Sequence, residues 1–222
     1  MNQPQYHGRI RHSISIMENT PHATCLDIGC GNGWSHAHVA KSRHKCAVSL
    51  DINEQSIREL SKRNPECIVV VGSATQLPFR LKTFDLIACW EVIEHIKKEK
   101  EKDIFNEAQK CLGRTGYLLI STPASNILSN FLDPAWYIGH RHYSHAEIEA
   151  FSSKYYFNTL ELYTRGNIWD LAATLLFYID IHVFGSRTAW HKLLDRARDR
   201  EYVKNEGRAT LFGIFQKQIE EK

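Results

Sequence analysis

Two short runs of the sequence hold side chains that can exchange protons or bind metal ions. Glu91, Glu94 and His95 fall close together, and His140 and His142 lie further along the chain on either side of an arginine. A neutral imidazole is the natural general base near pH 7, and carboxylates with imidazoles also suit a divalent cation. We predict that one of the three histidines is a base, while a metal-binding alternative would use the same side chains.

A glycine-rich turn indicates where a ligand could bind. Residues 24–28 are an apolar run that predicts a short buried strand, and 34–41 have the periodicity of a helix. Between them stand Gly29, Gly31 and Gly33. Strand, glycine turn and helix begin a βαβ nucleotide-binding unit, in which glycine permits positive φ and lets the backbone approach a ligand closely.

The residues around this turn distinguish between two kinds of ligand. In the dinucleotide fingerprint G-x-G-x-x-G, the third glycine falls where this chain has Trp34. Asp27, just before the turn, would repel a pyrophosphate but suits a ligand that carries an ammonium and a sulfonium group. Asp51 follows the strand predicted over 46–50, at about the distance from Gly29 at which an acidic residue meets ribose hydroxyls. We predict that role for Asp51; the alternative is a carboxylate that stabilises a helix N-terminus.

Composition limits the class of protein. The 222 residues are 43% hydrophobic and 24% charged, which is typical of a globular protein, and the net charge of +3 is too small to indicate a nucleic-acid partner. Six scattered cysteines without a C-x-x-C pair predict reduced thiols in a cytoplasmic protein. No signal-peptide core and no run of 18 apolar residues are present, so we expect no membrane-spanning helix.

Alternating strand and helix patterns predict an α/β fold over a single domain, 1–222. Further strands are expected over 67–71, 84–90, 117–121, 157–164 and 208–216, and helices over 54–63, 99–111 and 145–153. Asn53 is an expected N-cap, and Ser144 with Glu147 forms an expected capping box.

Two segments lie outside this pattern. Residues 1–23 form a leader with helical spacing of apolar residues; we expect it to be a surface helix, and the alternative is that Arg9 and its neighbours cover a ligand pocket. Residues 166–206 form a helical insertion before the last strand, with helices expected over 169–184 and 190–203. The apolar first helix must be covered by its own domain, by a second subunit, or by an apolar substrate or membrane surface.

The segments that carry these residues resemble the motifs of class I S-adenosylmethionine (SAM) dependent methyltransferases. Residues 25–34 are similar to the first motif, and 72–79 are similar to G-D-A-x-x-L-P-F with Ser73 in place of the acidic residue. Residues 84–95 are close to the F-D-x-I-x-x-x-E-V-I-E-H run of the ubiquinone-biosynthesis-like (type 11/type 23) methyltransferases. The resemblance covers roughly 24–165 and the last strand. It implies a Rossmann-like, seven-stranded, mostly parallel sheet with an antiparallel edge strand and helices on both faces.

The resemblance also implies a site at the carboxyl ends of the strands. It implies SAM as the cofactor and S-adenosyl-L-homocysteine as the product, with cofactor contacts from Asp27, Gly29, Cys30, Gly31, Gly33, Asp51, Ile52, Ser73, Ala74, Trp90 and Glu91. The predicted catalytic residues are His95, His140 and His142, and the predicted substrate contacts are Arg141 and Tyr143, with no metal.

We therefore expect a methyltransferase that acts on a small or lipid-linked acceptor, at a hydroxyl oxygen. One alternative is a metal-dependent RNA 3′-terminal 2′-O-methyltransferase, because Glu91, Glu94 and His95 with His140 or His142 resemble the metal-binding set of those enzymes. Another is a non-catalytic protein that binds SAM or its product. Nucleic acid is not an expected partner, peripheral membrane contact is possible, and either a monomer or a homodimer fits.

Overall fold

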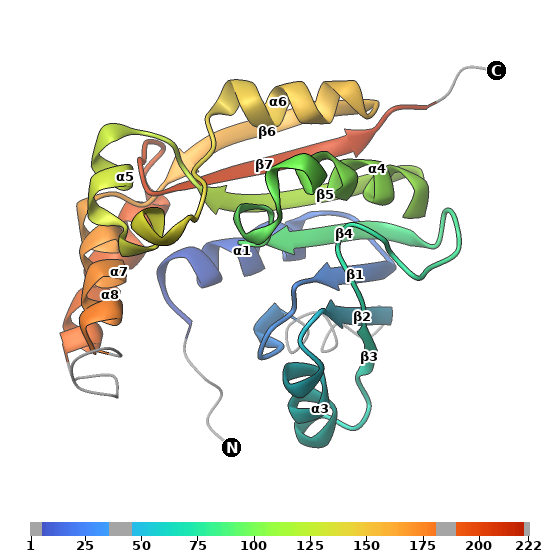
Figure 1. Ribbon diagram of the computed structural model, residues 1–222, viewed down its shortest axis with the longest axis horizontal. Coiled ribbons are helices and arrows are strands. Elements are labelled where there is room, and N and C mark those ends of the chain that lie inside the picture. Colours follow the sequence, from blue (N-terminus) through green and yellow to red (C-terminus); the bar gives the residue numbers. More distant parts are fainter. Residues whose placement is uncertain (1–5, 36–45, 181–189, 220–222) are drawn as a thin grey trace.

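The computed structural model describes residues 6–35, 46–180 and 190–219, and its centre is a seven-stranded sheet with the order β3-β2-β1-β4-β5-β7-β6 (Figure 1). The strands are β1 Thr24–Ile28, β2 Cys46–Asp51, β3 Ile68–Val71, β4 Phe84–Trp90, β5 Leu112–Pro123, β6 Phe157–Arg165 and β7 Thr210–Lys217. β1 to β5 pair in parallel, whereas β7 is antiparallel to both β5 and β6. The predicted α/β sheet is confirmed, with one refinement: the antiparallel strand is second from the edge, and β6 is the edge strand.

The helices cover both faces of the sheet. They are α1 Gly8–Asn19, α3 Glu54–Arg63, α4 Glu101–Cys111, α5 Ile127–Leu132, α6 His145–Lys154, α7 Ile168–Ile179 and α8 Trp190–Val203, with 3₁₀ turns η1 Ile93–His95, η2 Lys98–Lys100 and η3 Pro134–Ile138. Of the helix expected over 34–41, only residues 34 and 35 are described, and both are helical. None of the described helices is long and apolar enough to cross a membrane.

Local signals set several element boundaries as predicted. The Asn53 side chain accepts a hydrogen bond from the Ser56 amide at the start of α3, and Ser144 and Glu147 form the predicted capping box. The central strands are largely apolar because neighbouring layers cover them on both faces. All six cysteines are free thiols, as predicted.

Two apolar layers hold the helices against the sheet. On one face, Phe105 of α4 and Ile148 of α6 are fully buried against β4, β5 and β7. On the other face, Met17 of α1 and Tyr202 of α8 pack against Trp90 and its neighbours. Helix α1 of the leader and helix α8 of the insertion therefore pack in one layer on the same face of the sheet.

The start of α7 is capped by a residue distant in sequence. The Glu201 carboxylate on α8 accepts hydrogen bonds from the amides of Asn167, Trp169 and Asp170 at 2.8, 3.0 and 3.0 Å. These amides have no partner within their own helix, and a negative charge at a helix N-terminus is favourable. The contact fixes the two insertion helices to each other.

Replacing Glu201 with alanine tests this contact. We expect Glu201→Ala to lower the free energy of unfolding by about 2 kcal/mol, because three buried amides lose a charged acceptor. Urea denaturation measures the change, and Glu206→Ala, an exposed acidic residue nearby, is the matched control with an expected change under about 0.5 kcal/mol. Equal effects of the two substitutions would contradict the role of Glu201.

Candidate functional site

The glycine turn after β1 packs directly against the end of β4. Gly29, Gly31 and Gly33 all have positive φ, at 71°, 49° and 77°. A Cβ atom on Gly29 would overlap Cγ2 of Val92, so this position has no room for a side chain. A Cβ atom on Gly31 would meet nothing within 4 Å. The turn is thus closed on the Val92 side and open at Gly31.

Asp51 holds the open part of this turn. Its Oδ2 accepts a hydrogen bond from the Gly31 amide and its Oδ1 accepts one from the Asn53 amide, both at 2.8 Å. The carboxylate retains lone pairs for further donors such as ligand hydroxyls. The bond to Asn53 also lies at the start of α3, so the two roles weighed for Asp51 are compatible. Next to it, the apolar side chain of Ile52 is 76% exposed.

Asp27 is a buried carboxyl group beneath the same turn. Burial raises its pKa to about 7, although the hydroxyl of Ser35, which donates a hydrogen bond to it, acts in the opposite direction. The nearby charge of Asp51 raises the pKa further. A positively charged ligand group placed beside Asp27 would favour its ionised form. This agrees with the expectation that Asp27 suits a ligand that carries an ammonium and a sulfonium group.

Glu91 joins the end of β4 to two other elements. Its φ is +55°, which is uncommon for a residue other than glycine. Its carboxylate accepts hydrogen bonds from the Arg9 guanidinium at 2.5 Å and from Ser121 Oγ at 2.8 Å. Arg9 lies on α1, so the leader helix reaches the candidate site. No local sequence signal indicated this pairing, because 82 positions separate the two residues and β1 to β4 lie between them.

The leader helix is held in that position by α8. The Asp199 carboxylate accepts hydrogen bonds from the Gly8 amide at 2.7 Å and from Nδ1 of His7 at 2.8 Å. Arg11 also pairs with Asp199. These contacts cap the start of α1 and orient the turn that carries Arg9.

Glu94 is a buried carboxyl group. Burial and the neighbouring Glu91 raise its pKa well above the usual value, and its carboxyl accepts a hydrogen bond from Thr122 Oγ1 at 3.1 Å. A carboxyl with a raised pKa is a weak ligand for a metal ion near neutral pH. Within residues 6–35, 46–180 and 190–219, no group of three or more histidine, cysteine, aspartate or glutamate side chains is arranged to hold a metal ion.

The structure separates the three candidate histidines into two environments. The rings of His95 and His140 lie 4.3 Å apart between centroids and nearly perpendicular. Burial lowers the pKa of His95, and the charges of His140 and Arg141 lower it further, so this imidazole stays neutral at pH 7. A neutral imidazole is the form that a general base requires.

His142 lies apart from this pair. Its side chain is fully buried, Nδ1 lies 2.8 Å from Asn130 Oδ1, and Nε2 lies 3.0 Å from the Asp133 carboxylate. Both ring nitrogens are occupied by residues of the segment that contains α5 and η3. This geometry argues against the prediction that His142 is a catalytic base and indicates a structural role instead.

Arg141 and Tyr143 also differ from their predicted role as substrate contacts. The Arg141 guanidinium forms an ion pair with Glu101 at 2.8 Å and donates to the carbonyl oxygens of Ile93 and Ile96. The hydroxyl of Tyr143, which is buried, donates to the Ile93 carbonyl at 3.3 Å. Both side chains therefore hold η1, the turn that positions His95.

Several predicted cofactor residues have side chains committed to packing or to local turns. The Trp90 indole donates to Sδ of Met17 on α1, and the Cys30 side chain packs with Ile57 of α3. The Ser73 hydroxyl accepts a hydrogen bond from the Thr75 amide at 3.2 Å. The side chains of Trp90 and Cys30 thus face other elements of the fold, and Ala74 is partly buried against the core.

Known proteins are similar to parts of this sequence and to its fold. Residues 26–120 match a family described as a methyltransferase domain. A Mycobacterium tuberculosis protein named a probable S-adenosylmethionine-dependent methyltransferase is 25% identical over 116 residues, which cover 51% of this chain and 41% of that protein. A ubiquinone biosynthesis O-methyltransferase of Idiomarina loihiensis is 30% identical over 112 residues, covering 47% and 44% of the two chains.

The fold extends beyond the matched sequence. The crystal structure of the [4+2]-cyclase SpnF superposes on this chain with a TM-score of 0.71 at 13% identity, and the match covers 97% of this chain and 88% of that one. The aligned part of the chain spans about two fifths of the length of the first curated relatives. The comparisons therefore support the cofactor class and the fold, but they leave the acceptor open.

The raised pKa of Asp27 predicts a specific pH dependence of stability. Between about pH 4 and pH 7 the folded protein keeps a proton on Asp27 that the unfolded chain releases. The unfolding free energy of the wild type should therefore fall, relative to that of Asp27→Asn, by up to roughly 4 kcal/mol as the pH rises through this range.

Urea denaturation at several pH values measures this difference. Glu66→Gln, which removes an exposed carboxylate, is the control and should show almost no relative slope. Parallel curves for the wild type and Asp27→Asn would mean that Asp27 is ionised in the folded protein across the whole range.

Proposed function

Because the chain carries a class I SAM-dependent methyltransferase domain, we propose that it transfers a methyl group from SAM to a hydroxyl oxygen of a small or lipid-linked acceptor. The observation that carries this proposal is the arrangement of Asp51 across the open glycine turn. The His95–His140 pair at the end of β4 supplies the base that an oxygen acceptor needs.

The residues present fit SAM as a ligand. The Asp51 carboxylate is fixed by two amides and would bind the ribose hydroxyls. The exposed apolar surface of Ile52 would pack against the adenine ring. Asp27 lies below the turn, where an ammonium or sulfonium group would stabilise its ionised form. When bound, SAM supplies a methyl group that is already activated by a positively charged sulfur.

The protein's own contribution to the reaction is orientation and removal of one proton. We assign the base to His95, which would take the proton that the acceptor hydroxyl loses as its oxygen gains the methyl group. His140 lies against this ring and orients it. Arg141 and Tyr143 hold η1 from below, so they act as positioning residues for His95.

The contacts of the two glutamates favour this proposal over the metal-dependent RNA alternative. Glu91 is neutralised by Arg9 and hydrogen-bonded by Ser121, and Glu94 is bound by Thr122. Neither carboxylate is left with the free, charged oxygens that a divalent cation selects. A cyclase with the same fold illustrates that a fold does not determine the reaction. A transfer assay therefore has to distinguish an enzyme from a non-catalytic SAM-binding protein.

The first experiment measures transfer of labelled methyl groups from SAM into fractionated cell extract, with and without a chelator. We expect label in small molecules or lipids, unaffected by the chelator. Asp51→Ala should abolish SAM binding in calorimetry, because the ribose loses its charged acceptor, while Asp103→Ala on α4 should bind normally. Chelator-sensitive label in short RNA would favour the metal-dependent reaction, and SAM binding without any transfer would favour a non-catalytic protein.

Substitution of His95 tests the assignment of the base. His95→Asn should keep SAM binding and lower kcat by roughly 10²- to 10⁴-fold, because the acceptor proton has no base. The acid limb of the wild-type pH profile should lie below pH 6.5, since the pKa of His95 is lowered from that value.

The control for this test is Lys98→Gln, a change of an exposed residue near η1 that should leave kcat unchanged. Normal turnover by His95→Asn would show that the base is elsewhere. His142→Asn should instead lower the free energy of unfolding, because it breaks the buried contacts of His142 with Asn130 and Asp133.

A further inference from the structure

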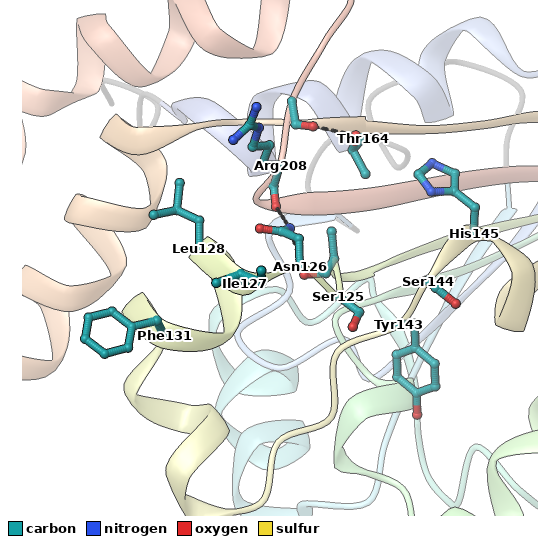
Figure 2. Close-up of a pocket in the computed structure, with 12 residues that line it drawn as sticks. Ser125, Asn126, Ile127, Leu128, Phe131, Tyr143, Ser144, His145, Thr164 and Arg208 are labelled. Atoms are coloured by element: carbon teal, nitrogen blue, oxygen red, sulfur yellow. Dashed lines mark hydrogen bonds between the residues drawn. The ribbon is translucent and has the colours of Figure 1, made fainter.

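A cavity of about 750 Å³ lies beside the candidate site, between α5, the start of α6 and the loop that leads into β7. Figure 2 shows its apolar side chains on α5, with Arg208 and His145 placed around it. The residues that line it include Ile127, Leu128, Phe131, Ser125, His145 and Arg208. A cavity of this size accommodates a small organic ligand.

The cavity is a neighbour of the candidate site and is separate from it. It begins at Ala124, two residues after Thr122, whose hydroxyl binds Glu94. Between them, the Tyr143 amide donates to the Pro123 carbonyl at 2.9 Å and the Ser125 amide donates to the Tyr143 carbonyl at 2.8 Å. These bonds hold the backbone of Tyr143, which also lines the cavity, beside the end of β5. Among the residues that the structure describes, none of those proposed to bind the cofactor or to act as the base lines the cavity.

The wall of the cavity on α5 is unusually apolar for a surface. Ile127 is 91% exposed and Phe131 is 71% exposed. The apolar surface continues on the neighbouring helix α7, where Ile168 and Trp169 are each about half exposed, at 48% and 49%. Large apolar side chains gathered at the mouth of a cavity mark a site that binds another apolar group.

The polar side of the cavity is basic. Arg208 is exposed, and its guanidinium forms no hydrogen bond or ion pair with any part of the chain that the structure describes. Its backbone is held on both sides: the amide donates to the Gly166 carbonyl at 2.7 Å, and the carbonyl accepts from the Asn126 side chain at 2.7 Å. The imidazole of His145 likewise has no bonded partner among the described residues. Among the residues that the structure describes, no aspartate or glutamate lines the cavity. An unpaired guanidinium beside an apolar wall is suited to a carboxylate or phosphate attached to a hydrocarbon.

We propose that this cavity binds a single anionic amphiphile, with its charged head at Arg208 and its hydrocarbon chain along Ile127, Leu128 and Phe131. Charge and apolarity occur together only on such a molecule; a free anion would leave the α5 wall in water, and a neutral hydrocarbon would leave Arg208 without a partner. This inference does not depend on methyl transfer, because it concerns a separate cavity.

Direct binding of decanoate to the full chain, measured by calorimetry with monomeric ligand, tests the proposal. Arg208→Gln should weaken decanoate binding about tenfold or more, and it should leave the binding of neutral 1-decanol unchanged. Ile127→Asn should weaken both ligands. Arg114→Gln, an exposed arginine at the opposite end of β5, is the matched control and should change neither.

The outcomes separate this proposal from its competitors. Decanoate affinity that is the same in the wild type, Arg208→Gln and Ile127→Asn would overturn it, and so would equal weakening by Arg114→Gln. Acetate that binds as tightly as decanoate would show a simple anion site. Binding to phosphatidylglycerol vesicles without binding of monomeric decanoate would replace the proposal with a membrane surface. The side chains of Arg208 and Ile127 are both exposed. Urea denaturation of each variant checks that it folds.

Discussion

The close approach of Val92 to Gly29 is the constraint on which the rest of the site depends. Because no Cβ atom fits at Gly29, the turn after β1 packs against the residue that follows Glu91 at the end of β4. This contact joins the side of the site that carries Asp51 to the side that carries His95. It also places Glu91 in a left-handed conformation, with its amide bonded to the Ser121 carbonyl, so three strand ends are fixed by one local geometry.

The site contains two pairs of carboxyl groups, and in each pair one group receives strong hydrogen-bond donors and the other is buried. Asp51 and Glu91 receive donors, from backbone amides in one case and from Arg9 and Ser121 in the other. Their neighbours Asp27 and Glu94 are buried, and their pKa values are raised partly by those charged partners. In each pair, the carboxylate that receives the donors lies near a buried carboxyl group whose pKa is raised. A cationic ligand would bring the buried member of the first pair into its charged form.

The parts of this structure that could be predicted from sequence are those specified by local signals. The strand 24–28 and the helix 54–63 have the predicted bounds because apolar runs and an asparagine cap define them within a few residues. β5 begins earlier than predicted, since the two glycines of Leu112–Gly116 favour a turn, yet Leu112 pairs with Phe84 beside a bulge. The Arg9–Glu91 pair could not be predicted, because no local pattern relates residues on different layers. The contacts of His142 could not be predicted for a related reason: its partners lie in residues 124–143, where no periodicity indicates the backbone path.

The helical insertion is connected to the end of β4 through the leader helix. Asp199 on α8 fixes the start of α1, and α1 carries Arg9 to Glu91. A change in the insertion would therefore reach the end of β4 through the leader helix. The sequence match to the methyltransferase family spans residues 26–120, which include Asp27, Asp51 and Glu91 but exclude α1, α5, α7 and α8. The matched segment holds the residues proposed for the cofactor, whereas the cavity under α5 and the cover formed by α1 and α8 lie outside it. This is the physical reason that comparison identifies the cofactor and leaves the acceptor to be determined from the surfaces that are particular to this chain.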